Sequence, residues 1–329
     1  MNKIQFSVVI PLYNKVNSVN KTIESIYAQR YAASEIIIVD DGSSDGSFEK
    51  VKELNIPNLK IVQQKNQGVS AARNLGVSLA RFRYIAFLDA DDQWSPFFLT
   101  EMHNLILRFP EQNFFASHYQ KVIKQDIYID PKLAIENVSP TGCILENYFS
   151  VASKGDLPFM VSSCVITSCL FYQLGGFPVG ESMGEDQELF SRVALQSKIV
   201  FSPLVLLLYH TDAENRACDR HTPQTILPFA IRLMRLTLTQ SINTELKQDI
   251  LRYCGAHVCH LAKLNIRAGH FFVAKRLLKM DVCKFKPKHR LMFYLWTEFC
   301  ICNSLIKGLF KWIRRSLHKS RNLEVKNET

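Results

Sequence analysis

The stretch Tyr84–Trp94, YIAFLDADDQW, runs from an apolar segment straight into three carboxylates, Asp89, Asp91 and Asp92. The uninterrupted apolar residues Tyr84–Leu88 predict a buried strand. Carboxylates that are held together at the end of such a strand repel one another, and their burial costs free energy unless a positive group lies near them. The stretch therefore indicates either a solvated turn or a site for a cation, with a phosphate behind it.

The first hundred residues alternate between β-branched runs and segments with helical spacing. Strands are expected at Phe6–Leu12, Glu35–Val39, Leu59–Gln63 and Tyr84–Leu88, with helices between them at Asn17–Ala28, Phe48–Leu54 and Gly68–Ala80. This alternation predicts an α/β fold with a parallel sheet and right-handed crossovers. Ligands of such sheets bind beyond the carboxyl ends of the strands. Both acidic clusters, Asp40–Asp41 and Asp89–Asp91, are expected at that edge.

The rest of the chain is less regular up to residue 212 and helical after it. Strands are expected at Phe114–His118, Ser163–Thr167 and Val200–Tyr209, and a helix after Gly184. Residues 213–290 have a helical pattern, and residues 291–329 form a basic tail.

Charge and cysteine usage narrow the class of protein. The net charge is +10, but the segment from Lys284 to Arg321 carries ten Lys or Arg against the single acid Glu298 and supplies +9 of it. The body is therefore nearly neutral, which argues against a nucleic-acid partner. Nine scattered cysteines without a CxxC pair favour a reducing compartment. The sequence shows no recognisable signal peptide. It also contains no run of about 18 uncharged apolar residues, the length needed to span a bilayer.

Asp89 and Asp91 are the first candidate site. Alternate residues of an extended segment project to the same side, so the two carboxylates suit a hard divalent cation. An EF-hand is excluded because Trp94 and Thr100 stand where that loop needs Gly and Glu.

Three other polar segments have both an ordinary and a functional interpretation. The Asp40–Gly46 cluster is a turn or places Asp41 against a base or ribose. Arg73, in a helix of small residues, is solvated or directed at a nucleotide. Glu185 and Asp186 are ordinary first-turn acids or a catalytic pair. The phosphate-binding motifs GxxxxGK[ST] and GxGxxG are absent from the sequence.

Taken together, these motifs carry a family resemblance over roughly residues 4–195. The ordered series Pro11-Leu-Tyr-Asn14, Asp-Asp-Gly-Ser-Ser-Asp, Gln67-Gly…Ala72-Arg-Asn-x-Gly76, Asp89-Ala-Asp91-Asp92 and Gly184-Glu-Asp186 resembles the family 2 glycosyltransferases of GT-A fold, of the bacterial surface-polysaccharide type. The resemblance implies a catalytic domain over residues 1–212, with a nucleotide-sugar half at 1–110 and an acceptor half at 111–212. A helical region and the basic amphipathic tail would follow.

The resemblance also implies roles for individual residues. The donor, a UDP-type nucleotide sugar, would be held by Pro11, Leu12, Tyr13, Asp41, Arg73, Asp89 and Ala90. Asp91 would bind Mn²⁺ or Mg²⁺ at the diphosphate, and His210 is a further candidate ligand. Asp186 would be the general base, with Glu185 beside it, and Gly176–Phe177 would shape the acceptor side.

Departures from the family pattern refine these expectations. Phe190 stands where relatives often carry Trp, and the Gln-x-x-Arg-Trp motif of processive synthases is absent, so transfer of a single sugar to a glycan or lipid-linked acceptor is expected. Two rivals stay open: a haloacid-dehalogenase-like phosphatase, and a non-catalytic membrane-bound nucleotide-sugar-binding protein. A zinc site at Cys254, His257, Cys259 and His260 lacks a second matching ligand pair.

The tail is the last feature with a functional interpretation. From Ile301 onward, apolar residues such as Leu305, Leu309 and Trp312 share one helical face, and basic residues occupy the other. Such a helix, expected to start after Glu298, packs on its own domain or lies in an anionic membrane interface. The setting implied by the resemblance is cytoplasmic and peripheral, on the inner face of the cell membrane.

Overall fold

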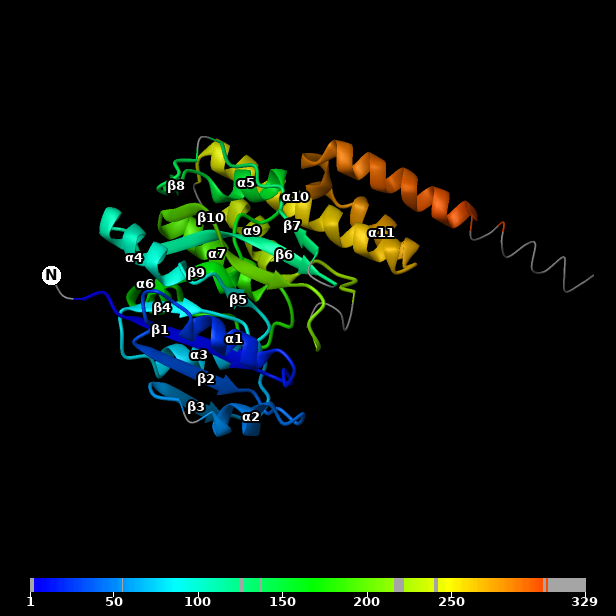
Figure 1. Ribbon diagram of the computed structural model, residues 1–329. Helices are drawn as coiled ribbons and strands as arrows, with labels where there is room; N and C mark the ends of the chain where they lie inside the picture. The colour runs from blue at the N-terminus through cyan, green and yellow to red at the C-terminus, as the bar shows by residue number, and fades with distance from the viewer. Residues whose placement is uncertain are drawn as a thin grey trace, which may run out of the picture. The chain divides into compact units, whose positions relative to one another are not determined.

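The computed structural model describes residues 3–54, 56–124, 127–136, 138–215, 222–239, 242–303 and 306 (Figure 1). The chain divides into two compact units. The first comprises Met1–His221 and Leu227–Tyr253, and the second Thr222–Ile226 and Cys254–Thr329. All the strands of the described residues belong to the first unit.

The first unit is built on one mixed sheet with strand order β3-β2-β1-β4-β9-β6-β10-β5. Strands β1, β2, β3 and β4 are mutually parallel, as are β6 and β10, and the other pairs are antiparallel. The longest ladders are the parallel ones, so the predicted α/β class with a mixed, mainly parallel sheet is confirmed. The strands are β1 (Phe6–Leu12), β2 (Glu35–Asp40), β3 (Leu59–Gln63), β4 (Tyr84–Phe87), β5 (Gln93–Trp94), β6 (Phe114–Ile123), β7 (Ile127–Ile129), β8 (Cys143–Leu145), β9 (Cys164–Thr167) and β10 (Ile199–His210).

Helices cover both faces of the parallel half. Helices α1 (Val19–Tyr27), α2 (Ser47–Glu53) and α4 (Phe98–Arg108) pack in the larger apolar core, where Ile23 lies among side chains such as Ile10 and Ile38. Helix α3 (Val69–Ser78) lies on the other face, where Ala72 packs with Ile37 and Val39. The alternation of side chains along β2 thus supplies a core to each face.

The strand order changes direction at β1. The chain passes from β1 to β2 and β3 on one side, then returns to place β4 on the other side of β1. Val9 is in register with Phe87, and the Leu88 amide donates to the Val9 carbonyl at 3.1 Å. A crevice opens at the carboxyl ends of strands at such a switch point. The three aspartates follow β4 at this edge of the sheet.

The remaining helices of the first unit are α5 (Tyr148–Lys154), α6 (Ser168–Leu174), α7 (Glu185–Gln196) and α9 (Pro228–Thr239). Helix α10 (Thr244–Arg267) begins in the first unit and ends in the second, which also contains α11 (Phe271–Leu278), the 3₁₀ helix η2 (Asp281–Phe285) and a helix over residues 287–303. The prediction that the last helix starts after Glu298 is wrong, because Glu298 lies within it and pairs with Lys275 at 2.5 Å. Apart from residues 301–303 and 306, the tail from Ile301 lies outside the described residues.

The close approach of α3 to β1 gives a stability prediction. A Cβ at Gly76 would lie 2.3 Å from Val9 Cγ1, and this valine is fully buried. Gly76→Ala should lower the free energy of unfolding by about 1–2 kcal/mol, because overpacking outweighs the gain in helix propensity. Chemical denaturation measures the difference. Ser78→Ala, at an exposed position of the same helix, should stay within about 0.5 kcal/mol of wild type; equal stabilities for the two variants would contradict this account.

Candidate functional site

Arg73 joins the two acidic segments. Helix α3 places its guanidinium 2.6 Å from Asp89 Oδ1 through Nη2 and 3.1 Å from Glu185 Oε1 through Nη1. Arg73 is 2% exposed, and its guanidinium carbon lies 5.1 Å from the centre of the Phe177 ring. Burial opposes the charge, but the neighbouring Asp89 and Glu185 outweigh it and raise the pKa of Arg73. The loop after β4 and the start of α7 therefore meet at one permanent cation.

Asp41 holds the segment that leads into α3. Its carboxylate accepts hydrogen bonds from the Gln67 and Gly68 amides, each at 2.8 Å, and from Gln64 Nε2 at 2.7 Å. Asp41 is 3% exposed. These bonds tie the carboxyl end of β2 to the segment that leads into α3 and so help to fix Arg73.

The three aspartates after β4 have different environments. Asp92 is 1% exposed and accepts hydrogen bonds from Ser162 Oγ at 2.6 Å and from the His210 amide at 3.2 Å. Burial, and next the charges of Asp91 and Asp89, raise the pKa of Asp92 well above its usual range. Asp92 thus links the loop after β4 to Ser162 and to the end of β10 by buried hydrogen bonds. Asp89 and Asp91 instead pair with the cations Arg73 and Lys15.

Lys15 supplies the positive group at Asp91. Its ammonium lies 2.6 Å from Asp91 Oδ2 and also donates to the Glu214 carbonyl. The Glu214 carboxylate accepts from the Asn17 amide and from Ser18 Oγ, both at 3.1 Å. The segment after β10 is thereby fastened to the loop between β1 and α1.

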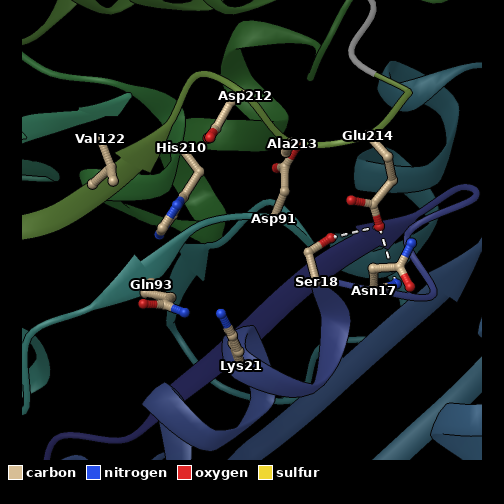
Figure 2. A pocket seen from close by; sticks show the side chains of 10 residues that line it. All are labelled: Asn17, Ser18, Lys21, Asp91, Gln93, Val122, His210, Asp212, Ala213 and Glu214. Carbon is tan, nitrogen blue, oxygen red and sulfur yellow. Dashed lines mark hydrogen bonds between the residues drawn. The ribbon is translucent and has the colours of Figure 1, made fainter. Parts of the chain in front are cut away.

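A cavity of about 250 Å³ opens beside Asp91, and Figure 2 shows Asp91 and His210 among its lining side chains. Asp212 and Glu214 also line it, against a single lysine in the lining, Lys21. Sites that enclose a whole small-molecule ligand usually measure about 300–1,000 Å³. This cavity therefore suits part of a larger ligand, and its acidic lining suits a cation.

The side chains at this cavity could supply some, but not all, of the ligands of Mg²⁺ or Mn²⁺. Among the described residues, no group of three or more His, Cys, Asp and Glu side chains is arranged to hold a metal, at the cavity or at the cysteines and histidines of α10. A Mg²⁺ ion in proteins is often held by one or two carboxylates, with phosphates and water as the other ligands. Asp91, which is paired with Lys15, lines the cavity together with the acids Asp212 and Glu214 and could contribute a carboxylate to that arrangement.

Asp186 begins helix α7 together with Glu185. Burial, and next the charge of Glu185, raise the pKa of Asp186 to about 7, although the Gln187 amide, which donates to Asp186 Oδ1 at 2.6 Å, and Arg73 oppose that rise. A carboxylate with such a pKa accepts a proton effectively near neutral pH.

The fold brings the predicted site residues into two neighbouring groups. Arg73, Asp89 and Glu185 form one with Asp186, and Asp91 and His210 line the cavity of the other. Leu12 and Ala90 are at most 2% exposed, and Pro11 is buried, so their side chains offer little surface to a ligand. The Tyr13 carbonyl accepts from Asn215 Nδ2 at 3.2 Å.

Sequence reasoning missed Lys15, Ser162 and Glu214. A lysine three residues after β1 was a usable signal for Lys15, because the carboxyl end of β1 adjoins that of β4. Phe177, expected on the acceptor side, is 2% exposed and supports Arg73.

Comparison with known proteins first identifies the fold. The TarS fragment 1–349 of S. aureus, solved in complex with UDP-GlcNAc, matches 90% of this chain and 91% of its own length with a TM-score of 0.65 at 16% sequence identity. At that identity the likeness concerns the fold, which is the predicted GT-A type.

Sequence similarity relates the first half of the chain to one family. Residues 7–158 match the model of Glycosyl transferase family 2. An uncharacterized glycosyltransferase of Rickettsia conorii is 33% identical over 212 residues, covering 60% of this chain and 32% of the relative. The Escherichia coli UDP-Glc:alpha-D-GlcNAc-diphosphoundecaprenol beta-1,3-glucosyltransferase WfaP is 35% identical over 126 residues, covering 37% of this chain and 48% of the relative. Residues 7–158 are thus similar to glycosyltransferase family 2, and the chain spans about a third of the length of several curated relatives.

The raised pKa of Asp186 predicts a pH-dependent stability. The folded protein binds this proton more tightly than an unfolded chain, in which the pKa is about 3.8, so ionisation costs stability as the pH rises from about 4 to about 7. Asp186→Asn removes that cost and keeps the bond from the Gln187 amide. At about pH 8 the variant should be more stable by about 1–3 kcal/mol.

Denaturation at several pH values checks this prediction. The difference in the free energy of unfolding between variant and wild type should shrink as the pH falls toward about 4. Glu111→Gln, at an exposed position of the same unit, should show no such trend. A gap independent of pH would mean that burial does not raise this pKa.

Proposed function

We propose that this chain is an inverting glycosyltransferase that moves a single sugar from a UDP-type nucleotide sugar to a hydroxyl group of a glycan or lipid-linked acceptor. The observation that carries the proposal is the pair of contacts at Arg73. One buried cation links Asp89, of the motif after β4, to the helix end that bears Asp186. This link brings the segments of Asp89 and Asp186 together, which supports a donor-binding motif and a base at one site.

Each residue has a defined part in the proposed reaction. Asp186 takes the proton from the acceptor hydroxyl as its oxygen bonds to the anomeric carbon. The bond from that carbon to the phosphate oxygen breaks on the opposite face, so the configuration inverts. Arg73 keeps Asp89 and Glu185 in place, with Asp89 at the ribose and Asp41 at the base.

The proposal includes Mn²⁺ or Mg²⁺ at Asp91, with His210 as a further candidate ligand. Such an ion would neutralise charge that develops on the departing nucleoside diphosphate. The acidic lining of the cavity and the ion pair of Asp91 support this placement. TarS in complex with UDP-GlcNAc and WfaP, named for UDP-Glc, favour UDP in the donor.

The name of one relative supports the acceptor, and the location is carried over from the family resemblance. WfaP is named for a diphosphoundecaprenol-linked sugar. We therefore propose a lipid-linked acceptor, surface-polysaccharide assembly and a cytoplasmic, peripheral position on the inner face of the membrane. None of the helices in the described ranges has the length and apolarity needed to cross a bilayer.

The rival functions are less well supported. A haloacid-dehalogenase-like phosphatase needs an aspartate after its first strand, but β1 is followed by Tyr13, Asn14 and Lys15. A non-catalytic binding protein would not need a carboxylate with a pKa of about 7 at the site, which Asp186 provides.

Titration calorimetry with UDP and GDP, in Mn²⁺ and again in EDTA, tests the donor site. We expect UDP to bind in preference to GDP and only with the metal. Asp91→Asn should weaken metal-dependent binding about tenfold or more, which corresponds to ~1.4 kcal/mol, and Glu111→Gln should bind as wild type does. Failure of UDP to bind under both conditions would refute the proposal.

The assignment of the base has its own test, once a screen of UDP-sugars has found an active donor and acceptor. Asp186→Asn should keep UDP affinity and lose about 10²–10⁴-fold in turnover, because no carboxylate takes the proton. In the wild type, kcat/KM should rise with pH through about 7, where Asp186 ionises. Unchanged turnover in the variant would remove Asp186 from this role.

A further inference from the structure

The helix over residues 287–303, orange in Figure 1, has several exposed apolar side chains. Leu291, Leu295 and Phe299 are 62%, 59% and 68% exposed, and the adjacent Met292 and Trp296 are 52% and 36% exposed. Residues spaced by three or four positions share one face of a helix. These five side chains therefore form one continuous strip, the 291–299 face.

The opposite side of the same helix carries the contacts with the rest of its unit. On that side Phe293 and Thr297 are 6% and 0% exposed. Glu298 lies at the edge of the apolar strip and pairs with Lys275 of α11. The outward position of the 291–299 face is thus fixed by packing on the other side. Contiguous exposed apolar surface of this kind marks an interaction site more often than a bare monomer surface.

The charge of residues 254–303 indicates the kind of partner that this surface would bind. Residues 254–303 contain nine Lys or Arg against two acids, a net charge of +7. Both acids are already paired, Asp281 with Lys284 and Glu298 with Lys275, each at 2.5 Å. Lys284, Lys288 and His289, around the start of the helix, are exposed. The partner should therefore be apolar at its centre and anionic around it.

We propose that the 291–299 face docks on the surface of an anionic lipid bilayer. Leucine and aromatic side chains enter the boundary between headgroups and acyl chains, and flanking lysines meet anionic headgroups. A second copy of this chain would bring an equal positive charge to the contact. The chain beyond residue 303 is also basic, with seven Lys or Arg against two acids. The surface precedes the amphipathic pattern predicted from Ile301 onward, and it does not depend on the glycosyltransferase proposal.

Cosedimentation of the full chain with vesicles tests this inference. We expect the protein to bind phosphatidylcholine vesicles that contain phosphatidylglycerol, to bind pure phosphatidylcholine at least tenfold more weakly, and to dissociate in high salt. The double variant Leu295→Ser, Phe299→Ser should lower the partition coefficient at least tenfold. Leu238→Ser, an 81% exposed leucine of α9, is the matched control and should bind as wild type does.

Two further measurements make the outcomes decisive. If the double variant binds vesicles as well as the control does, the inference is wrong. If sedimentation velocity without lipid shows that wild type is a dimer and the double variant a monomer, a second copy covers this face and the inference also fails. UDP titration of the same proteins separates the two proposals, since vesicle binding without UDP binding would refute the donor site alone.

Discussion

The site depends on one buried cation. Arg73 is 2% exposed, and its charge is balanced by Asp89 from the loop after β4 and Glu185 from the start of α7. Leaving one side of such a buried pair without its partner typically costs about 3–5 kcal/mol. The arrangement therefore constrains three elements at once: α3 must pack close to β1, the β4 loop must turn back, and α7 must begin at that point.

The three aspartates that follow β4 have different partners although they are neighbours in the sequence. Asp89 pairs with Arg73 and Asp91 with Lys15, whereas Asp92 is enclosed by Ser162 and the His210 amide. Repulsion among the three is lowered because two have cationic partners and the third favours its protonated form. The hydrogen bond from the His210 amide to Asp92 also holds the end of β10, and His210 lines the cavity beside Asp91.

Local pattern predicted much of the first unit. Strands β1 and β3 were expected with the bounds that the structure has, and β2 and β4 within one residue, because β-branched runs between turns have few alternatives. The pairing of Lys15 with Asp91 spans 76 positions and depends on strand order, which periodicity does not encode. The prediction that the last helix starts after Glu298 also failed because of a contact distant in sequence. Lys275, on α11, forms an ion pair with Glu298, which lies within the helix. The roles of Asp41, Asp91, Asp186 and His210 remain predictions.

The ion pair with Lys15 gives Asp91 an internal counter-ion at the pocket. A divalent ion entering alone would have to exchange with an ammonium group that is already bonded to two oxygens. A diphosphate changes that balance because it brings negative charge for both the ion and the displaced lysine. Under the proposed function, nucleotide and ion would then each strengthen the binding of the other, by equal factors. Under the same proposal, Lys15 would exchange its partner from Asp91 to the diphosphate as the nucleotide and the ion bind together.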